Sequence, residues 1–142
     1  MTIKSYLEEL QSAKRTPGGG TVAAITCTIG VALLKKELPD ETILTELTRV
    51  LLNLQEYDIE IYAKEKTNEI LEESIRIPLA IMMCASIALK IAKKNSKPQA
   101  AIYLETGIKC ANIYALLNLK WIENEHFIEI VKTTCGSILK TL

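Results

Sequence analysis

The turn that organises the chain reads TPGGGTVAAI, from Thr16 to Ile25. Its three glycines stand between an amphipathic helical pattern and a run of small apolar residues. Glycine loses more backbone entropy on folding than other residues, so such a run is kept where a side chain cannot fit or where φ is positive. We expect either another helix or an anion to approach here, because a helix beginning near Thr21 presents unpaired N–H groups and a positive dipole end. Glycines that serve only as a tight turn are a further alternative.

Length and composition predict one globular domain over residues 1–142, with 49% hydrophobic and 24% charged residues. Basic and acidic residues number 17 each, so no net charge attracts nucleic acid or an acidic membrane. The strongest apolar stretch, Ile77–Ala92, is interrupted by Pro78, Ser86 and Lys90, and the N-terminus has no signal-peptide pattern. We therefore expect a cytoplasmic protein with no nucleic-acid or membrane partner.

The cysteines and the single histidine do not predict a metal or redox site. Cys27, Cys84, Cys110 and Cys135 are far apart in the sequence and form no C-x-x-C pair. We expect them to be core side chains or exposed thiols. His126 lies in the polar segment ENEH, where we expect a helix to start and the imidazole to face solvent.

Hydrophobic residues recur with a helical period along nearly the whole chain, and no strand pattern competes with it. The first predicted helix is capped by Thr2 or by Ser5 paired with Glu8, and Asp40 is the predicted cap of the third. The segment 77–92 is apolar on all sides, which is typical of a helix enclosed by others. The sequence thus predicts an all-α compact bundle of five or six helices with a buried central helix. The predicted helices cover about 3–10, 21–36, 40–66, 69 into the basic segment 93–98, 98–122 and 124–140.

Two polar residues fall on apolar helix faces. Asp58 lies in the middle of the face formed by Ile43, Leu47, Leu51, Leu54, Ile61 and Tyr62. A carboxylate in a core must be paired, hydrogen-bonded or protonated with a raised pKa, so Asp58 is either a structural group or a general acid or base. Asn118 follows the small-residue stripe Gly107, Ala111 and Ala115, which lets another helix approach closely, inside the bundle or across a dimer. A buried Asn holds a backbone carbonyl or recognises a ligand.

The segment from Ser12 to Ala24, SAKRTPGGGTVAA, resembles the Pro-Gly-Gly-Gly-Ser-Val-Ala-Ala segment of the cyclodeaminase/methenyltetrahydrofolate cyclohydrolase family. This family includes the cyclodeaminase domain of formiminotransferase-cyclodeaminase. Further matches follow in the family's order, so the resemblance spans most of the chain. They are Glu56-Tyr57-Asp58 with Tyr62, Ile77-Pro78-Leu79, Leu104-Glu105-Thr106-Gly107 and Asn118-Leu119-Lys120.

The resemblance implies a helical homodimer that acts on one-carbon derivatives of tetrahydrofolate. Two reactions are known in the family: formimino-tetrahydrofolate closes to methenyltetrahydrofolate with loss of ammonia, a lyase reaction, or the methenyl bridge is hydrolysed to formyl. Both need proton transfer and stabilisation of a tetrahedral carbon, and the resemblance implies no metal or redox cofactor. It makes Asp58 the catalytic carboxylate. The residues it places at the folate are Pro17, Gly18, Gly19, Gly20, Thr21 and Asn118.

The chain departs from the family's pattern in two respects. It is shorter than the usual member, with a segment missing after the second helix and another after the third. It also reads Asn95-Ser96-Lys97-Pro98 where the family tends to carry Ser-Asp before a long helix. Two function classes therefore stay open: a tetrahydrofolate enzyme, or a non-catalytic folate- or anion-binding helical module or assembly subunit.

Overall fold

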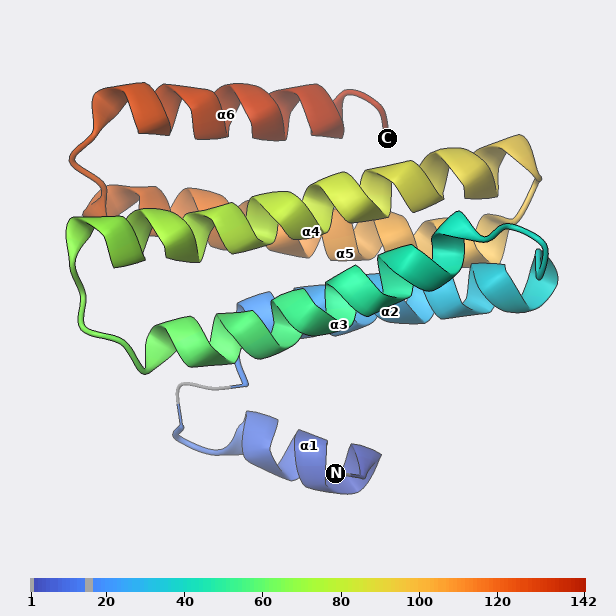
Figure 1. Ribbon diagram of the computed structural model, residues 1–142, viewed down its shortest axis with the longest axis horizontal. Coiled ribbons are helices and arrows are strands. Elements are labelled where there is room, and N and C mark those ends of the chain that lie inside the picture. The colour runs from blue at the N-terminus through green and yellow to red at the C-terminus, as the bar shows by residue number, and fades with distance from the viewer. Residues whose placement is uncertain (1, 15–16) are drawn as a thin grey trace.

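The computed structural model describes residues 2–14 and 17–142, so Arg15 and Thr16 of the glycine segment lie outside the described residues. In the described part, six α-helices and one short 3₁₀ helix make up the regular structure (Figure 1). The all-α prediction is confirmed. The elements are α1 (Ile3–Gln11), α2 (Gly19–Glu37), α3 (Ile43–Tyr62), α4 (Asn68–Lys94), α5 (Pro98–Asn118), η1 (Leu119–Trp121) and α6 (Glu125–Leu139).

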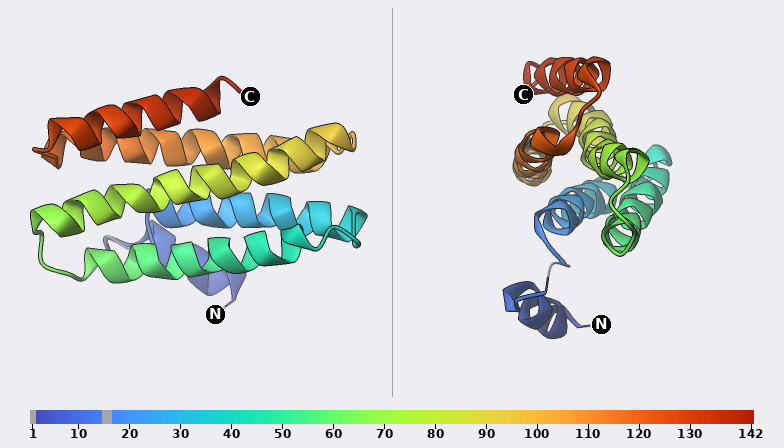
Figure 2. Two further views of the ribbon diagram at one scale, coloured as in Figure 1. Left: turned by 45° about the horizontal axis from the view of Figure 1, so that its top comes forward. Right: turned by 90° about the vertical axis from the view of Figure 1, so that its left-hand side faces the viewer.

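The helices from α2 to α6 run in alternating directions and lie lengthwise against one another (Figure 1). In the end-on view of Figure 2, α2 and α5 form one edge of the bundle, and α6 covers the top of α4 and α5. Short connections join antiparallel neighbours, as expected for an up-and-down bundle. The short helix α1 lies apart from the bundle, on the side that α2 and α3 form (Figures 1 and 2).

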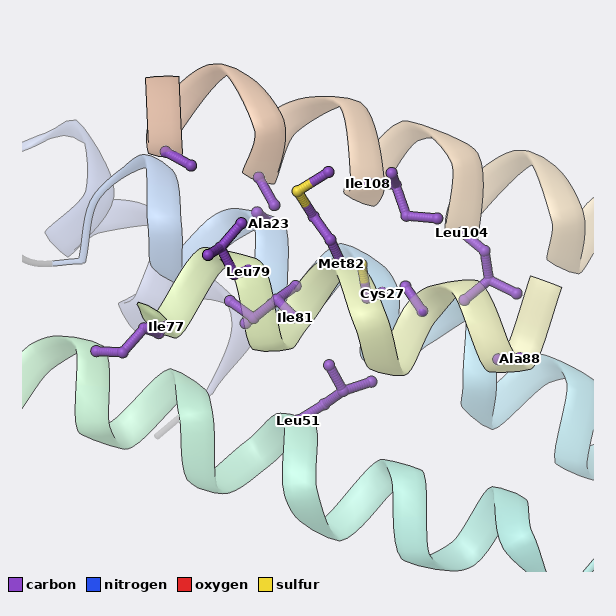
Figure 3. Packing of buried hydrophobic residues seen from close by; sticks show 14 of the residues in the cluster. Ala23, Cys27, Leu51, Ile77, Leu79, Ile81, Met82, Ala88, Leu104 and Ile108 are labelled. Carbon is purple, nitrogen blue, oxygen red and sulfur yellow. The ribbon is translucent and has the colours of Figure 1, made fainter. Parts of the chain in front are cut away.

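The predicted central helix is α4, which packs against α2, α3, α5 and α6. Its side chains from Ile75 to Ala92 are buried on several sides, among them Ile81 and Met82, which point toward different neighbours in Figure 3. Pro78 lies inside the continuous helix and is buried. Enclosure by four helices therefore explains why this segment lacks a polar face.

The small-residue stripe of α5 packs inside the bundle, against α2. A Cβ atom at Gly107 would clash with Cys27 Sγ and would lie 3.3 Å from the backbone oxygen of Ala23. A Cβ atom at Gly30 of α2 would lie 2.8 Å from Leu104 Cγ. Each glycine therefore makes room for a residue of the facing helix. The small-residue stripe was predicted to pack either inside the bundle or across a dimer, and it packs inside the bundle.

Several helix boundaries differ from the predicted ones. The third helix begins at Ile43 with Thr42 as its N-cap, because residues 38–44 form turns first, and Asp40 is exposed before it. Leu44 is buried in place of Ile43, which is 42% exposed. The fifth helix ends at Asn118 and continues as η1. Thr2, one of the two predicted caps of α1, accepts a hydrogen bond from the Ser5 N–H at 3.0 Å.

Two helices are long and apolar enough to span a membrane by length and composition alone, Gly19–Glu37 and Asn68–Lys94. The helix α4 has 27 residues and so extends beyond the interrupted apolar stretch Ile77–Ala92 of the sequence analysis. In the most apolar 18-residue window, 44% of the Gly19–Glu37 helix and 56% of the Asn68–Lys94 helix are buried inside the bundle. Core helices of soluble proteins are also long and apolar enough to meet this test.

Candidate functional site

The glycine turn connects directly to Asp58 through one hydroxyl group. Gly18 is the N-cap of α2 and has no side chain to cap the helix. Its N–H donates to Thr21 Oγ1 at 3.4 Å, and Thr21 Oγ1 donates to Asp58 Oδ2 at 3.1 Å. Thr21 is completely buried. The threonine that ends the glycine run therefore fixes the orientation of the carboxyl group on α3.

Asp58 is 1% exposed, and among the described residues it and Thr21 are the two buried polar side chains. No described cation forms a salt bridge with it, and its Oδ1 has no hydrogen-bond partner. Burial raises the pKa of Asp58 from 3.8 to about 6, while the Thr21 hydrogen bond lowers it by a smaller amount. A group with this pKa exchanges its proton close to neutral pH, as a general base must.

Gly20 lies where the turn, Asp58 and α5 meet. A Cβ atom at this position would lie 2.9 Å from Tyr114 Cε1 and 3.0 Å from both carboxylate oxygens of Asp58. Contacts that short force a displacement, so any larger residue would push the aromatic ring or the carboxyl group away. A Cβ atom at Gly19 would lie 3.5 Å from Tyr114 Cδ2, an ordinary contact. The close approach expected from the glycine run thus occurs at Gly20, with a side chain of another helix.

Asn118 lies on the same side of α5 as Tyr114, one turn further along. It is half-buried, and its Nδ2 donates to the backbone oxygen of Tyr114 at 2.9 Å. The amide therefore holds a backbone carbonyl, which was one of its two predicted uses. Its side chain also lines a cavity, so the second use stays open.

An open cavity of about 620 Å³ lies beside the glycine turn, large enough for a small organic ligand. The Lys66 ammonium group lies 4.7 Å from the centre of the Tyr62 ring and brings a positive charge to the cavity. The start of α2 adds the N–H groups that an α-helix leaves without helical partners in its first turn. The residues that line the cavity are Gly18, Gly19, Tyr62, Lys66, Leu71, Ser74, Tyr114, Asn118 and Trp121.

The structure brings most of the predicted site residues together. Gly18, Gly19 and Asn118 line the cavity, whereas Gly20 and Thr21 contact Asp58. Asp58 itself does not line the cavity, and Pro17 is buried next to the turn. His126 is exposed near the start of α6. In the part of the chain that the structure describes, no three His, Cys, Asp or Glu side chains are grouped so that they could hold a metal ion.

Sequence reasoning missed the aromatic and basic side chains of the cavity, Tyr114, Trp121 and Lys66. For Tyr114 a signal was present, because it precedes Asn118 by four residues and so shares its helix face. Lys66 and Trp121 lie beyond the ends of α3 and α5 proper. No periodicity places such residues, since their position depends on how two chain segments meet in space.

The fold is an up-and-down helical bundle in which the glycine turn opens α2. A sequence model of the formiminotransferase-cyclodeaminase family matches residues 2–38. The fold is shared with a solved structure, formiminotetrahydrofolate cyclodeaminase from Thermotoga maritima, at a TM-score of 0.88 and 16% identity. That match covers 99% of this chain and 89% of the other. No curated protein sequence matches the chain. The resemblance read from the sequence is therefore confirmed, by one family model at the N-terminus and by the fold throughout.

The first prediction compares two neighbouring glycines. We expect Gly20→Ala to lower the free energy of unfolding by roughly 1–3 kcal/mol, because its methyl group overpacks Tyr114 and Asp58. Gly19→Ala makes only an ordinary contact and should leave stability within about 0.5 kcal/mol of the wild type, as at other tolerant positions. Urea denaturation of both variants measures the difference. Equal stabilities would contradict the close packing at Gly20.

Proposed function

We propose that the chain is a tetrahydrofolate one-carbon enzyme, either a formimino-tetrahydrofolate cyclodeaminase or a methenyltetrahydrofolate cyclohydrolase. One observation carries the proposal: a buried carboxyl group with a pKa of about 6 is held by the glycine turn that borders the cavity. The family model at residues 2–38 and the cyclodeaminase fold support the choice of substrate class.

The cavity suits the chemistry of a folate. Tyr62, Tyr114 and Trp121 offer aromatic surfaces for the flat ring systems of the substrate. Lys66 and the N–H group of Gly19 are suited to its carboxylates or ring carbonyl oxygen. We assign Asn118 to hydrogen bonding with a polar edge of the substrate through its amide oxygen. Pro17, Gly20 and Thr21 shape the turn on which these contacts depend.

Asp58 acts in this proposal as the proton acceptor. In cyclodeamination, a folate nitrogen attacks the formimino carbon and loses its proton, and the amino group then leaves as ammonia after gaining one. In cyclohydrolysis, a water molecule attacks the bridging carbon and loses its proton before one carbon–nitrogen bond breaks. In both reactions a single carboxylate takes up a proton and returns it to the leaving nitrogen. Asp58 does not line the cavity, and the Thr21 hydroxyl links it by hydrogen bonds to Gly18, which does.

The second prediction tests Asp58 against a matched carboxylate. Asp58→Asn removes the proton acceptor at constant size, so we expect the rate to fall by ~10²–10⁴-fold. Glu60→Gln makes the same change at an exposed position of the same helix and should leave the rate unchanged. The assay follows methenyltetrahydrofolate absorbance, which rises from formimino substrate or falls on hydrolysis. The wild-type kcat/KM should rise with pH through about 6, as the carboxyl group ionises.

A folate- or anion-binding module without turnover is the alternative, and the complete burial of Asp58 behind the turn favours it. Binding of tetrahydrofolate derivatives without any rate above that of buffer would establish this alternative. An Asp58→Asn variant that turns over like the wild type would remove Asp58 from the catalytic assignment.

We also propose that the chain forms a homodimer through the edge made by α2 and α5. These helices lie side by side (Figure 2) and expose Ile29, Ile102, Ile113 and Leu117 at 48% to 63%. Large apolar side chains exposed on neighbouring helices are typical of interfaces. A second copy is the occupant we propose, because a two-fold axis matches the same face to itself and a chain with zero net charge does not repel its copy.

The third prediction concerns this interface. The wild type should sediment as a dimer at micromolar concentration, and Ile113→Lys should shift it to monomer, because the lysine brings an unpaired charge into an apolar contact. Ile130→Lys, the same substitution at an exposed site on α6, is the control and should stay dimeric. A monomeric wild type, or equal behaviour of the two variants, would contradict the proposed interface.

A further inference from the structure

The ring of Tyr114 lies against the glycine turn at the point where Asp58 meets it. A Cβ atom on Gly20 would be 2.9 Å from Tyr114 Cε1 and 3.0 Å from each carboxylate oxygen of Asp58, and these are the three atoms nearest to that position. On the preceding residue, Gly19, a Cβ atom would be 3.5 Å from Cδ2 of the same ring. The ring therefore extends along the turn from Gly19 to Gly20, and Asp58 meets the turn at its Gly20 end.

Tyr114 belongs to the wall of the cavity, whereas Asp58 does not. The tyrosine is half-buried and lines the cavity of about 620 Å³ together with Gly18 and Gly19. Asp58 is 1% exposed, and its Oδ1 is inaccessible to solvent and has no hydrogen-bond partner among the described residues. Buried polar atoms are almost always hydrogen-bonded, so an unpaired acceptor beside a cavity calls for a physical explanation. Tyr114 is thus part both of the cavity wall and of the contact that encloses this acceptor.

Two other side chains lie near Asp58 on the same side, Thr21 and Tyr62. Thr21 Oγ1 donates to Asp58 Oδ2 at 3.1 Å, so this side chain holds the carboxyl group and does not leave it without losing that bond. Tyr62 lines the cavity one helical turn after Asp58, and the Lys66 ammonium group lies 4.7 Å from the centre of its ring. No atom of Tyr62 is among the three nearest to the Cβ position of Gly20. Tyr62 is therefore the alternative that an experiment has to separate from Tyr114.

The surroundings of Tyr114 allow its ring to move while its backbone stays in place. Asn118 Nδ2 donates to the backbone oxygen of Tyr114 at 2.9 Å, within a continuous helix. The turn that the ring faces carries no side chains at Gly19 and Gly20, so nothing on it interlocks with the ring. The open cavity on the other side offers space for a different rotamer.

We propose that the Tyr114 ring is the partition between the cavity and Asp58, and that a ligand in the cavity reaches the carboxyl group only when this ring turns away from Gly20. The unpaired Oδ1 is then the acceptor that the turned ring uncovers. A proton acceptor has to come within hydrogen-bond distance of the reacting group, directly or through one water. The role of the partition in a reaction rests on the proposed function of Asp58, but the closure itself is a property of the substrate-free protein.

The fourth prediction measures the accessibility of Asp58 in the substrate-free protein. A water-soluble carbodiimide with glycinamide converts accessible carboxyl groups to amides, and mass spectrometry of the peptides gives the rate at each position. We expect Asp58 to react slowly in the wild type and in Tyr114→Phe, which keeps the ring. Tyr114→Ala removes the ring and should raise the rate at Asp58 at least about tenfold, since minor conformations are populated at ~0.1–10%. The exposed Glu60 of the same helix is the internal reference and should react equally in all variants.

Two control variants separate a partition at Tyr114 from other causes of exposure. Leu104→Ala deletes a buried side chain elsewhere on α5, where it packs against Gly30, and so loosens the bundle without changing the site. Tyr62→Ala removes the other aromatic side chain near Asp58 on the cavity wall.

A faster reaction of Asp58 in Tyr114→Ala alone supports the partition. No increase, or an increase of the same size in Leu104→Ala or Tyr62→Ala, overturns it. If the alanine variant does not fold, Tyr114→Leu lacks the ring atom next to Gly20 but keeps apolar packing, and should change the rate in the same direction. A wild type without turnover would end the proposed enzymatic function, while the labelling would still decide whether Tyr114 closes off Asp58.

Discussion

The close approach of Asp58, Tyr114 and the backbone of Gly20 is the constraint on which the site depends. Three helices, α2, α3 and α5, meet there, and no side chain can stand at the meeting point. The absence of a Cβ atom lets the start of α2 lie against the carboxyl group, and the Thr21 hydroxyl then holds it. Because water is excluded, the carboxyl group keeps its proton up to a pH near neutrality. The absence of a side chain at Gly20 therefore allows both the close packing of the three helices and the burial that raises the pKa of Asp58.

The rest of the bundle keeps this meeting point rigid. The enclosed helix α4 packs against α2, α3, α5 and α6, so the spacing of the helices that carry the site is set by a dense core. Gly107 and Gly30 bring α2 and α5 together further along the same pair. The helix α1 is the exception, since none of its residues is buried.

Much of the fold was predictable from the sequence, because helical period, caps and an apolar central segment are local properties. Thr2, the glycine turn, Asp58 and Asn118 were each visible as residues that break or interrupt a pattern. Asp40 failed as a cap because residues 38–44 form turns before the helix begins, which depends on the packing of a loop. Lys66 and Trp121 were not found, since they reach the site from segments whose approach only the tertiary structure defines.

The most direct measurement is the free energy of unfolding of the wild type and of Asp58→Asn across pH. The folded-state pKa of about 6 exceeds the ordinary 3.8, so the folded chain holds this proton more tightly than the unfolded chain. The stability of the wild type relative to Asp58→Asn should therefore be greatest below pH 4. It should fall by on the order of 3 kcal/mol by pH 7, the equivalent of a shift of about two units. A difference that does not change with pH, or that grows as the pH rises, would contradict a buried carboxyl group poised to accept protons.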